Sequence, residues 1–281
     1  MKYLRLLRAH QWIKNIFVLL PLIFSGGFLV PEMIIRTFIA CIAFSLVASG
    51  MYVMNDIRDL ESDKKHCEKS KRPIASGEIT VRKALLVGSL SLIAGIFAGY
   101  YLGILFLVVQ MVYIITNAIY SYYGKSVVIL DILLLALFYV IRVFAGAVAI
   151  DVVVSSWLFL TTFFLALFIG SGKRYVEFIM SDGKGRKVLE NYTEEFLRFT
   201  LEMTAFATLL TYTIYSTTRS AIFEFTIIFV LIGFLIYFYK LFRGEIKEDP
   251  VLTLIKDKIL ILVIVVWASF ALIAVYLTEI A

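Results

Sequence analysis

A short run of acidic and amide side chains, from Asn55 to Asp63, carries the clearest chemistry in the sequence. If the apolar segment before it continues as a helix, Asn55 and Asp59 stand one turn apart, and Asp56 and Asp63 stand two turns apart. Five carboxylate or amide side chains in nine residues offer the oxygen ligands of Mg²⁺, which commonly completes its shell with substrate phosphates. We therefore predict a magnesium site for a pyrophosphate, with ligands Asn55, Asp56, Asp59 and Asp63.

A solvated, charged helix end explains the same run equally well, because basic residues follow it closely. These counter-ions are Lys64, Lys65, Lys69 and Arg72. The segment from Lys71 to Gly77 adds cations and a sharp turn directly behind the acidic residues. Taken alone, the run leaves both interpretations open.

The composition places these side chains in a membrane protein. Of the 281 residues, 61% are apolar and 17% are charged, against about 45–50% and about 25% in soluble domains. The excess must be buried against lipid, which argues against disorder, a disulfide scaffold, a soluble nucleotide-binding fold and a nucleic-acid-binding domain. The net charge of +6 then indicates basic residues gathered at one membrane face rather than a nucleic acid partner.

Nine apolar segments approach the length of roughly 20 residues that a membrane-spanning helix needs. They cover residues 16–30, 34–54, 84–101, 104–121, 127–149, 152–170, 199–217, 221–242 and 259–278. Their apolar runs are continuous and lack the alternation of a membrane barrel strand. We therefore predict an all-α integral membrane protein with nine transmembrane helices in a single catalytic domain, residues 1–281.

The charges assign sides to the loops between these spans. One set of loops carries 23 of the 27 lysine and arginine residues. This set comprises residues 1–15, 55–83, 122–126, 171–198 and 243–258. By the positive-inside rule it is cytoplasmic, with the N-terminus inside and the C-terminus on the opposite side of the cell membrane. Its two long loops follow the second and sixth spans, which predicts a pseudo-repeat whose halves each contribute one loop to a shared site.

Two charged residues, Asp131 and Arg142, fall inside the fifth span, where ionisable side chains are costly and usually functional. At three helical turns of separation they face the same direction but stand roughly 16 Å apart, so they cannot pair directly. Arg142 fits either a hydrogen-bonding hub inside the bundle or a contact to a lipid phosphate. Lys14 and Asn15, at the mouth of the first span, can reach the same pocket, although Lys14 also fits a snorkelling interfacial lysine.

The run from Asn55 to Asp63 resembles the first aspartate-rich motif of the UbiA superfamily of intramembrane prenyltransferases, and the segment from Arg72 to Gly77 resembles the one that follows it there. Nine helices with two cytoplasmic catalytic loops is also the architecture of that superfamily. Further motifs resemble its decaprenyl-phosphate phosphoribosyltransferase branch. They are Arg8 to Asn15 with Leu20 and Pro21, then Tyr120, Ser121, Lys125, Leu130 and Asp131, then Arg142, Ala145 and Gly146, Ser156 and Trp157, and finally Lys173, Arg174 and Glu177. One departure is Gly124, where the branch more often has Leu.

This resemblance implies a reaction and its partners. The donor is phosphoribosyl pyrophosphate, the acceptor is a polyprenyl phosphate lipid, the cofactor is Mg²⁺ and the leaving group is pyrophosphate. In the family the product supplies arabinose for cell-wall polymers. The resemblance implies phosphate contacts from Lys14, Arg72, Lys125, Lys173 and Arg174, ribose contacts from Asp131 or Glu177, and further substrate contacts from Asn15, Tyr120 and Arg142.

The second long loop gives a physical reason to favour that branch. Aromatic prenyltransferases of the superfamily place a second acidic motif there, whereas this loop has more basic than acidic side chains. They are Lys173, Arg174, Glu177, Asp182, Lys184, Arg186 and Lys187. A donor with an additional 5-phosphate suits direct lysine and arginine contacts. A surface pair between Lys173 and Glu177, one helical turn apart, explains part of the pattern without any function.

Two other functions use the same residues differently. A prenyl pyrophosphate donor with an aromatic or other small acceptor keeps the superfamily and the metal, but the basic second loop argues against it. An ion-coupled transporter would use the acidic run for its ions. Its intramembrane charges should then gather at the midplane, whereas most charges here lie toward one face.

Overall fold

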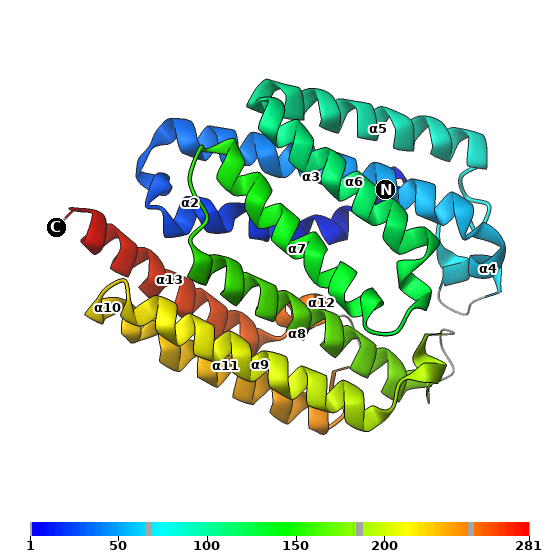
Figure 1. Ribbon diagram of the computed structural model, residues 1–281. Helices are drawn as coiled ribbons and strands as arrows, with labels where there is room; N and C mark the ends of the chain where they lie inside the picture. Colours follow the sequence, from blue (N-terminus) through cyan, green and yellow to red (C-terminus); the bar gives the residue numbers. More distant parts are fainter. Residues whose placement is uncertain (1, 66–68, 182, 184–187, 247–249, 281) are drawn as a thin grey trace. The chain divides into compact units, whose positions relative to one another are not determined.

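The computed structural model describes residues 2–65, 69–181, 183, 188–246 and 250–280. These residues are almost entirely helical and contain no strand (Figure 1). The chain divides into two compact units. The N-terminal unit comprises Met1–Leu22, Gly27–Ser121 and Ile141–Val153, and the C-terminal unit comprises Ile23–Gly26, Tyr122–Val140 and Val154–Ala281. Two helices contribute residues to both units, α2 (Leu20–Phe24) and α7 (Leu130–Ala149).

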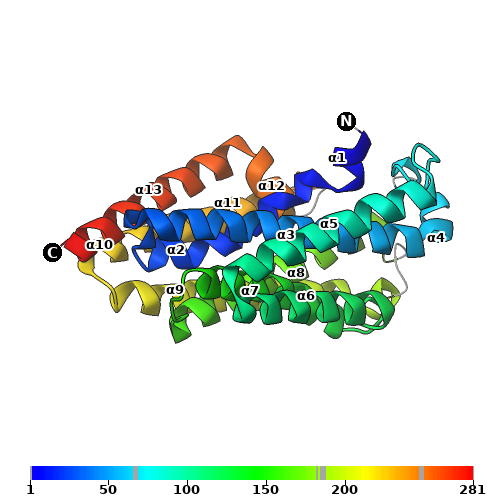
Figure 2. The same cartoon turned by 90° about the horizontal axis from the view of Figure 1, so that it is seen from above.

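The N-terminal unit is built on two long helices, α3 (Pro31–Arg58) and α5 (Val81–Leu102), which pack side by side (Figure 2). Its other elements are α1 (Lys2–Leu6), the 3₁₀ helices η1 (Ala9–Leu19), η2 (Gly27–Leu29) and η3 (Lys69–Lys71), α4 (Leu60–Lys64) and α6 (Ile104–Tyr122). Pro31 begins α3, where its missing N–H costs no hydrogen bond. Because α3 runs to Arg58, the acidic run starts on a helix, as the sequence predicts.

Small residues bring α3 and α5 close together. A Cβ atom on Gly95 would lie 2.8 Å from the carbonyl oxygen of Ala43, and one on Gly50 would lie 2.9 Å from the carbonyl oxygen of Gly88. Glycine at these positions lets the two backbones approach more closely than any side chain would allow, as in many membrane helix pairs. The position of the acidic run therefore depends on this contact, because the run continues directly from α3.

At the other end of α3, Arg36 binds the ends of two helices. Its guanidinium donates to the carbonyl oxygen of Ala149, the last residue of α7, at 2.6 Å, and to that of Leu102, the last residue of α5, at 3.4 Å. The last carbonyls of a helix have no partner within it and carry partial negative charge. Arg36 thus satisfies two helix C-termini, which accounts for one of the few basic residues outside the predicted cytoplasmic loops.

In the C-terminal unit, α8 (Ser156–Ser181) packs against α9 (Glu194–Thr217), and α11 (Thr226–Phe242) packs against α13 (Lys258–Ile280) (Figure 1). Its shorter elements are η4 (Gly124–Ser126), η5 (Leu189–Asn191), α10 (Ala221–Glu224) and α12 (Pro250–Lys256). Tyr212 joins three helices, because its hydroxyl accepts a hydrogen bond from Trp267 at 2.8 Å and bonds the hydroxyl of Thr226 at 2.7 Å. This buried polar contact stabilises the packing of α9, α11 and α13.

Seven described helices are long and apolar enough to cross a membrane, two fewer than the predicted nine. The predicted span 16–30 is divided among η1, α2 and η2, and Ala9–Phe24 forms a shorter apolar helical stretch. The predicted span 199–217 falls on α9, which has sufficient length but is less apolar than the seven, because threonine, tyrosine and serine recur along it. Within the predicted loop 171–198, α8 continues to Ser181 and places Lys173, Arg174 and Glu177 on a helix. The cytoplasmic side of this segment stays a prediction.

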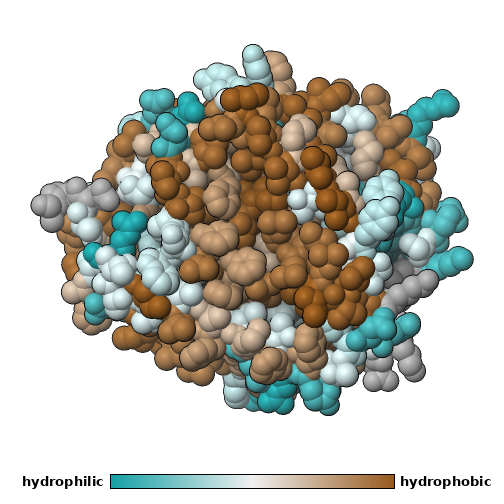
Figure 3. Space-filling view, viewed as in Figure 1, coloured by the Kyte–Doolittle hydropathy of each residue, from teal (hydrophilic) through white to brown (hydrophobic). Residues whose placement is uncertain are grey.

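The surface of these helices is strongly apolar, and apolar side chains cover most of the face seen in Figure 3. On α5 the exposed residues Leu86, Leu90, Ile93 and Phe97 recur every three or four positions and form one continuous stripe. A stripe of this kind on a soluble protein would promote aggregation, whereas lipid solvates it. The surface therefore agrees with the membrane environment that the composition predicts.

The close contact between α3 and α5 yields the first prediction. Gly95→Ala should lower the free energy of unfolding by about 1–3 kcal/mol, because the new methyl group overlaps a backbone oxygen that cannot move aside. The measurement is the thermal unfolding midpoint of the purified chain in mild detergent. Gly233→Ala on α11 is the matched control, since its Cβ would meet only Val263 at 3.7 Å. Equal unfolding midpoints for the two variants would show that the close contact at Gly95 contributes nothing to stability.

Candidate functional site

Asp56 and Asp63 share one guanidinium in the N-terminal unit. Arg72 donates from one nitrogen to Asp56 Oδ1 at 3.0 Å and to Asp63 Oδ2 at 2.5 Å. Both carboxylates are nearly buried, with side chains at most 5% exposed, whereas that of Arg72 is 29% exposed. The seven-residue spacing therefore brings the two carboxylates together, although α3 ends at Arg58 and a separate short helix, α4, carries Asp63.

Arg8 supplies a second guanidinium to the same carboxylate, because it also donates to Asp56 Oδ1. Its guanidinium stacks over the ring of Tyr52, 5.0 Å from the centroid. The backbone of Arg8 adopts a left-handed conformation, with φ of 50°, that is common for glycine but rare for residues with a side chain, asparagine and aspartate apart. Leu6 on one side is buried, and Trp12 on the other donates to Ser49 Oγ, so flanking contacts hold this conformation in place.

A tight turn carries Arg72 back toward the acids. The N–H of Ser76 bonds the carbonyl of Arg72 at 2.9 Å, the N–H of Ile79 bonds the carbonyl of Pro73 at 2.8 Å, and Gly77 has a φ of 78°. This confirms the turn predicted between Lys71 and Gly77. The turn is fixed from inside by an apolar cluster of Leu6, Val53, Ile74, Ile79 and Ala84.

Asn55 faces a different neighbour from Asp56. Its amide donates to Asn117 Oδ1 at 3.1 Å, and its own Oδ1 accepts from Ser121 Oγ at 2.8 Å, so α6 holds this side chain. Asp59 lies at the junction where α3 ends and α4 begins. The described residues contain no cluster of three or more histidine, cysteine, aspartate or glutamate side chains arranged around a metal position.

The donor set nevertheless fits a hard divalent cation. Mg²⁺ in enzymes is commonly held by only one or two protein carboxylates together with waters and substrate phosphates. Asp56 and Asp63 supply two carboxylates that already converge on one cation, the guanidinium of Arg72. Their bonds to arginine use Asp56 Oδ1 and Asp63 Oδ2. The other oxygen of each can therefore serve as a metal ligand.

Arg142 is the centre of a buried hydrogen-bond network in the N-terminal unit. It donates to Asn15 Oδ1 at 2.8 Å and to the Tyr113 hydroxyl at 3.3 Å, and it lies over the Tyr113 ring. Asn15 donates in turn to Ser45 Oγ at 2.7 Å. Of the two predicted roles for Arg142, the structure contains the hydrogen-bonding hub, which joins η1, α3, α6 and α7. A contact to a lipid phosphate stays a prediction.

A second ionic cluster occupies the C-terminal unit. Arg174 on α8 donates from Nε to Asp131 Oδ2, and the side chains of both residues are completely buried. Arg174 also donates to Glu177 Oε2 at 2.5 Å, and Glu177 remains 27% exposed. The guanidinium of Arg174 thus bonds two carboxylates, and Glu177 is the member of the cluster that reaches the surface. The predicted contact of Arg174 with substrate stays a prediction.

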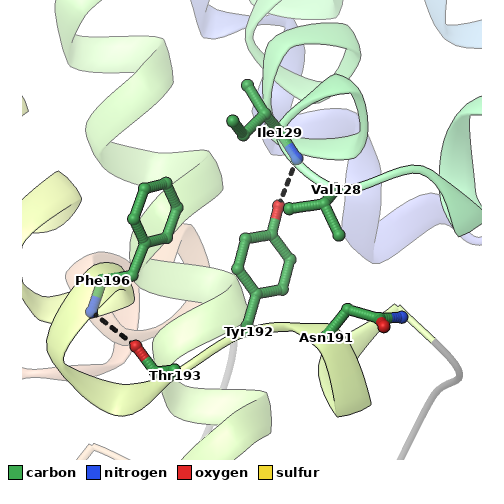
Figure 4. A pocket seen from close by; sticks show the side chains of 6 residues that line it. All are labelled: Val128, Ile129, Asn191, Tyr192, Thr193 and Phe196. Atoms are coloured by element: carbon green, nitrogen blue, oxygen red, sulfur yellow. Dashed lines mark hydrogen bonds between the residues drawn. The ribbon is translucent and has the colours of Figure 1, made fainter.

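Tyr192 completes this cluster from the loop between α8 and α9. Its hydroxyl donates to Asp131 Oδ1 at 2.7 Å. The same hydroxyl accepts the backbone N–H of Ile129 at 2.6 Å, the bond that Figure 4 shows. Burial raises the pKa of this hydroxyl, and the bond to the Asp131 carboxylate raises it further, because both disfavour the phenolate. The ring of Tyr192 also lines an open pocket of about 330 Å³ with Val128, Ile129, Asn191, Thr193 and Phe196 (Figure 4).

The remaining predicted site residues are partly exposed and belong to both units. Lys14 and Tyr120 lie in the N-terminal unit, on η1 and α6, whereas Lys125 and Lys173 lie in the C-terminal unit, on η4 and α8. Their roles as substrate ligands stay predictions. The other members of the basic loop, Asp182, Lys184, Arg186 and Lys187, lie outside the described residues.

Two residues of these clusters, Arg8 and Tyr192, were not predicted as site residues. Arg8 stands within a motif that the sequence comparison used, but its distance of 48 residues from Asp56 gives no sign of the pairing. Tyr192 is one of 16 tyrosines, and nothing in its local sequence separates it from the others. Only the three-dimensional contact identifies either residue.

The buried ion pair of the C-terminal unit generates the second prediction. Arg174→Leu should reduce the free energy of unfolding by about 3–5 kcal/mol, because it leaves the buried Asp131 carboxylate without its charged partner. Arg198→Leu is the control, since the pair of Arg198 with Glu202 is half exposed and should contribute about 0–1 kcal/mol. Denaturant unfolding in mild detergent gives both values. If both variants lost a similar free energy of unfolding, the buried pair would contribute no more to stability than the exposed pair, contrary to the prediction.

Comparison with known proteins agrees with these features. Residues 16–254 match the UbiA prenyltransferase family. A decaprenyl-phosphate phosphoribosyltransferase from Mycolicibacterium smegmatis is 30% identical, covering 97% of this chain and 92% of that protein, and one from Corynebacterium glutamicum is 31% identical, covering 98% and 86%. The fold resembles that of a UbiA homolog from Archaeoglobus fulgidus solved with GPP and Mg²⁺, with a TM-score of 0.74 and 20% identity over 98% of this chain and all of that one. This multi-pass membrane protein therefore belongs to the UbiA prenyltransferase family.

Proposed function

We propose that this membrane transferase moves 5-phosphoribose from phosphoribosyl pyrophosphate to a polyprenyl phosphate, with Mg²⁺ as cofactor and pyrophosphate as the product released. The observation that carries the proposal is the convergence of Asp56 and Asp63 on Arg72, in a chain that is 30–31% identical over nearly its full length to decaprenyl-phosphate phosphoribosyltransferases. Carboxylates for a metal and an arginine for phosphate, held in one cluster, suit a pyrophosphate leaving group.

The residues of the N-terminal unit act on the leaving group. Asp56 and Asp63 would hold Mg²⁺, with Asn55 and Asp59 as the further ligands that the sequence predicts, and the metal would supply positive charge against the charge that develops on the pyrophosphate. Arg72 has a partly exposed guanidinium beside both carboxylates and contacts the phosphate oxygens directly. Lys14 and Asn15 are further substrate contacts from η1, and Tyr120 is one from α6.

In the transfer step, the bond between ribose C1 and the pyrophosphate oxygen breaks, and its electron pair leaves with the pyrophosphate. A phosphate oxygen of the acceptor forms the new bond to C1. This oxygen is already anionic, so no side chain has to remove a proton. In-line attack inverts the configuration at C1, and the membrane-embedded fold gives the acceptor's long apolar tail a lipid environment.

The C-terminal unit contributes groups suited to a phosphorylated sugar. Lys125 and Lys173 are the phosphate contacts that we propose there, and the partly exposed carboxylate of Glu177 accepts a hydrogen bond from a ribose hydroxyl. Arg174 and Asp131, both buried, orient Glu177 rather than touching the donor. A cation-rich helix end also suits a donor that carries one phosphate more than a prenyl pyrophosphate.

The sidedness and domain organisation follow the charge distribution. The proposed arrangement has the N-terminus and the two long loops in the cytoplasm and one catalytic domain over residues 1–281, supported by the 23 of 27 basic residues on one set of loops. A polar phosphorylated donor would then approach from the cytoplasm, and the lipid acceptor from the bilayer.

The test of this function is a transfer assay with the purified chain. Labelled phosphoribosyl pyrophosphate, polyprenyl phosphate and Mg²⁺ should yield a labelled lipid, which mass spectrometry identifies as polyprenyl phosphate carrying one 5-phosphoribose. Chelation of the metal should abolish the product, and added Mg²⁺ should restore it. No product with any divalent cation would refute the proposal.

A second candidate function is prenyl transfer to an aromatic or other small acceptor. The observation that favours it is the match of residues 16–254 to the UbiA prenyltransferase family. The same preparation supplied with geranylgeranyl pyrophosphate and aromatic acids distinguishes the two. Prenylated product without any phosphoribosyl lipid would favour this second function.

Within the acidic cluster, Asp63→Asn should lower kcat on the order of 100-fold, because the variant keeps the shape of the side chain but loses a charge that helps to hold the metal. Glu61→Gln is the matched control on the same short helix. Glu61 is exposed and pairs with Lys64, so this variant should keep full activity. Steady-state rates at saturating substrate and Mg²⁺ provide the measurement. Full activity in Asp63→Asn would remove Asp63 from the metal site.

A further inference from the structure

The hydroxyl of Tyr192 connects two loops of the C-terminal unit. It accepts the N–H of Ile129, in the turn that leads into α7, and it donates to Asp131 Oδ1 in the first turn of that helix. Tyr192 itself lies between η5 and α9, more than 60 residues further along the chain. One hydroxyl thus determines how the start of α7 meets the loop before α9.

The turn that Tyr192 holds is conformationally costly. Ile129 has a φ of 69°, a left-handed conformation that is unfavourable for a β-branched side chain. Such strain persists only where surrounding contacts maintain it. The short hydrogen bond from the Ile129 N–H to the Tyr192 hydroxyl is one such contact. The strained turn lies two residues before Asp131, so releasing it would also release the carboxylate.

From Asp131 the contacts continue to the one partly exposed carboxylate of the cluster. Asp131 uses one oxygen for Tyr192 and the other for Arg174, so both of its oxygens are engaged. Arg174 uses Nε for Asp131 and a terminal nitrogen for Glu177. Since Asp131 and Arg174 are completely buried, Glu177 is where this series of hydrogen bonds reaches the surface.

We infer that Tyr192 is a positioning residue for the ribose donor, acting through Asp131 and Arg174 to hold Glu177 in the orientation that binds a ribose hydroxyl. The inference rests on the proposed function, because Glu177 needs a sugar donor to bind. Tyr192 itself does not touch the reacting atoms. Its hydroxyl is a suitable donor because the raised pKa keeps it protonated across the physiological range.

The first experiment compares Tyr192→Phe with the full-length wild type in detergent or nanodiscs. Phenylalanine keeps the ring and its stacking on Phe196 but removes the hydroxyl. KM for phosphoribosyl pyrophosphate should rise about tenfold, the effect of one lost hydrogen bond to a charged group, whereas KM for polyprenyl phosphate should change less than twofold. The control Tyr101→Phe removes an exposed hydroxyl on α5 and should have the wild-type KM for both substrates.

The second experiment is a double-mutant cycle. In Asp131→Asn the charged partner of Tyr192 is already gone, so adding Tyr192→Phe should raise the KM for phosphoribosyl pyrophosphate no further. Equilibrium binding of phosphoribosyl pyrophosphate without acceptor should show the same pattern. Additive effects in the cycle would mean that Tyr192 acts independently of Asp131, and would overturn the inference.

A third measurement uses a variant that retains the hydroxyl, so that misfolding cannot decide the outcome. Fluorinated tyrosine at position 192 lowers the phenol pKa, and the absorbance of the phenolate shows at which pH the hydroxyl ionises and can no longer donate to Asp131. KM for the donor should rise over that pH range in the fluorinated protein and stay level in the wild type. A level profile in both, across a range in which the absorbance shows the fluorinated phenolate forming, would overturn the inference.

Failure of the inference is distinguishable from failure of the proposed function. A wild-type chain that neither binds phosphoribosyl pyrophosphate nor forms the phosphoribosyl lipid would refute the function, and the inference with it. A wild-type chain that does both, together with a Tyr192→Phe variant of unchanged donor KM, would refute the inference alone. A loss in Tyr192→Phe that affects donor and acceptor equally, with a lower unfolding midpoint, would assign Tyr192 a purely structural role and also refute it.

Discussion

A buried ionised side chain must receive its partner from the protein, because the apolar interior of a helical bundle offers none. Each unit satisfies this constraint with a carboxylate at one end of a long helix and a guanidinium brought from elsewhere in the chain. In the N-terminal unit Asp56 at the end of α3 binds Arg8 and Arg72. In the C-terminal unit Asp131 at the start of α7 binds Arg174. The turns and helix contacts around both clusters serve to keep these partners together.

Glycine contacts provide the helix positions that this pairing needs. In the N-terminal unit a Cβ on Gly146 would lie 2.0 Å from the carbonyl oxygen of Val18, so α7 and η1 approach closely only because residue 146 is glycine. That approach places Asn15 within hydrogen-bond distance of Arg142, one turn before Gly146. Gly50 and Gly95 likewise allow the backbones of α3 and α5 to approach closely. A bundle with larger residues at these positions would separate the polar partners and leave their charges exposed to lipid.

The sequence predicted those features that depend on local pattern. The helical bundle, the helical start of the acidic run and the turn at Gly77 follow from apolar length, residue spacing and a glycine in a left-handed conformation. The rest depends on contacts between distant segments. Whether Asn55 faces α6 or the carboxylates is decided by Asn117 and Ser121, which lie more than 60 residues away. Likewise, the pairing of Arg174 on α8 with Asp131 joins residues 43 positions apart, and hydropathy alone does not predict such an ion pair.

The choice of donor cannot be argued from the fold, because UbiA-like bundles are shared by proteins of different substrates and a likeness at 20% identity establishes only the architecture. The proposed choice of a phosphoribosyl donor is argued instead from the residues at the end of α8. Two acidic motifs that hold metal ions suit a prenyl pyrophosphate, because all of the charge of that donor lies on its pyrophosphate. Here one acidic cluster stands in the N-terminal unit, whereas the end of α8 carries Lys173 and an arginine already committed to Asp131 and Glu177. An arginine held in this way stabilises a carboxylate at the surface. Carboxylates accept hydrogen bonds from hydroxyl groups, which a ribose donor has and a prenyl donor lacks, and the proposed donor is argued from this chemistry.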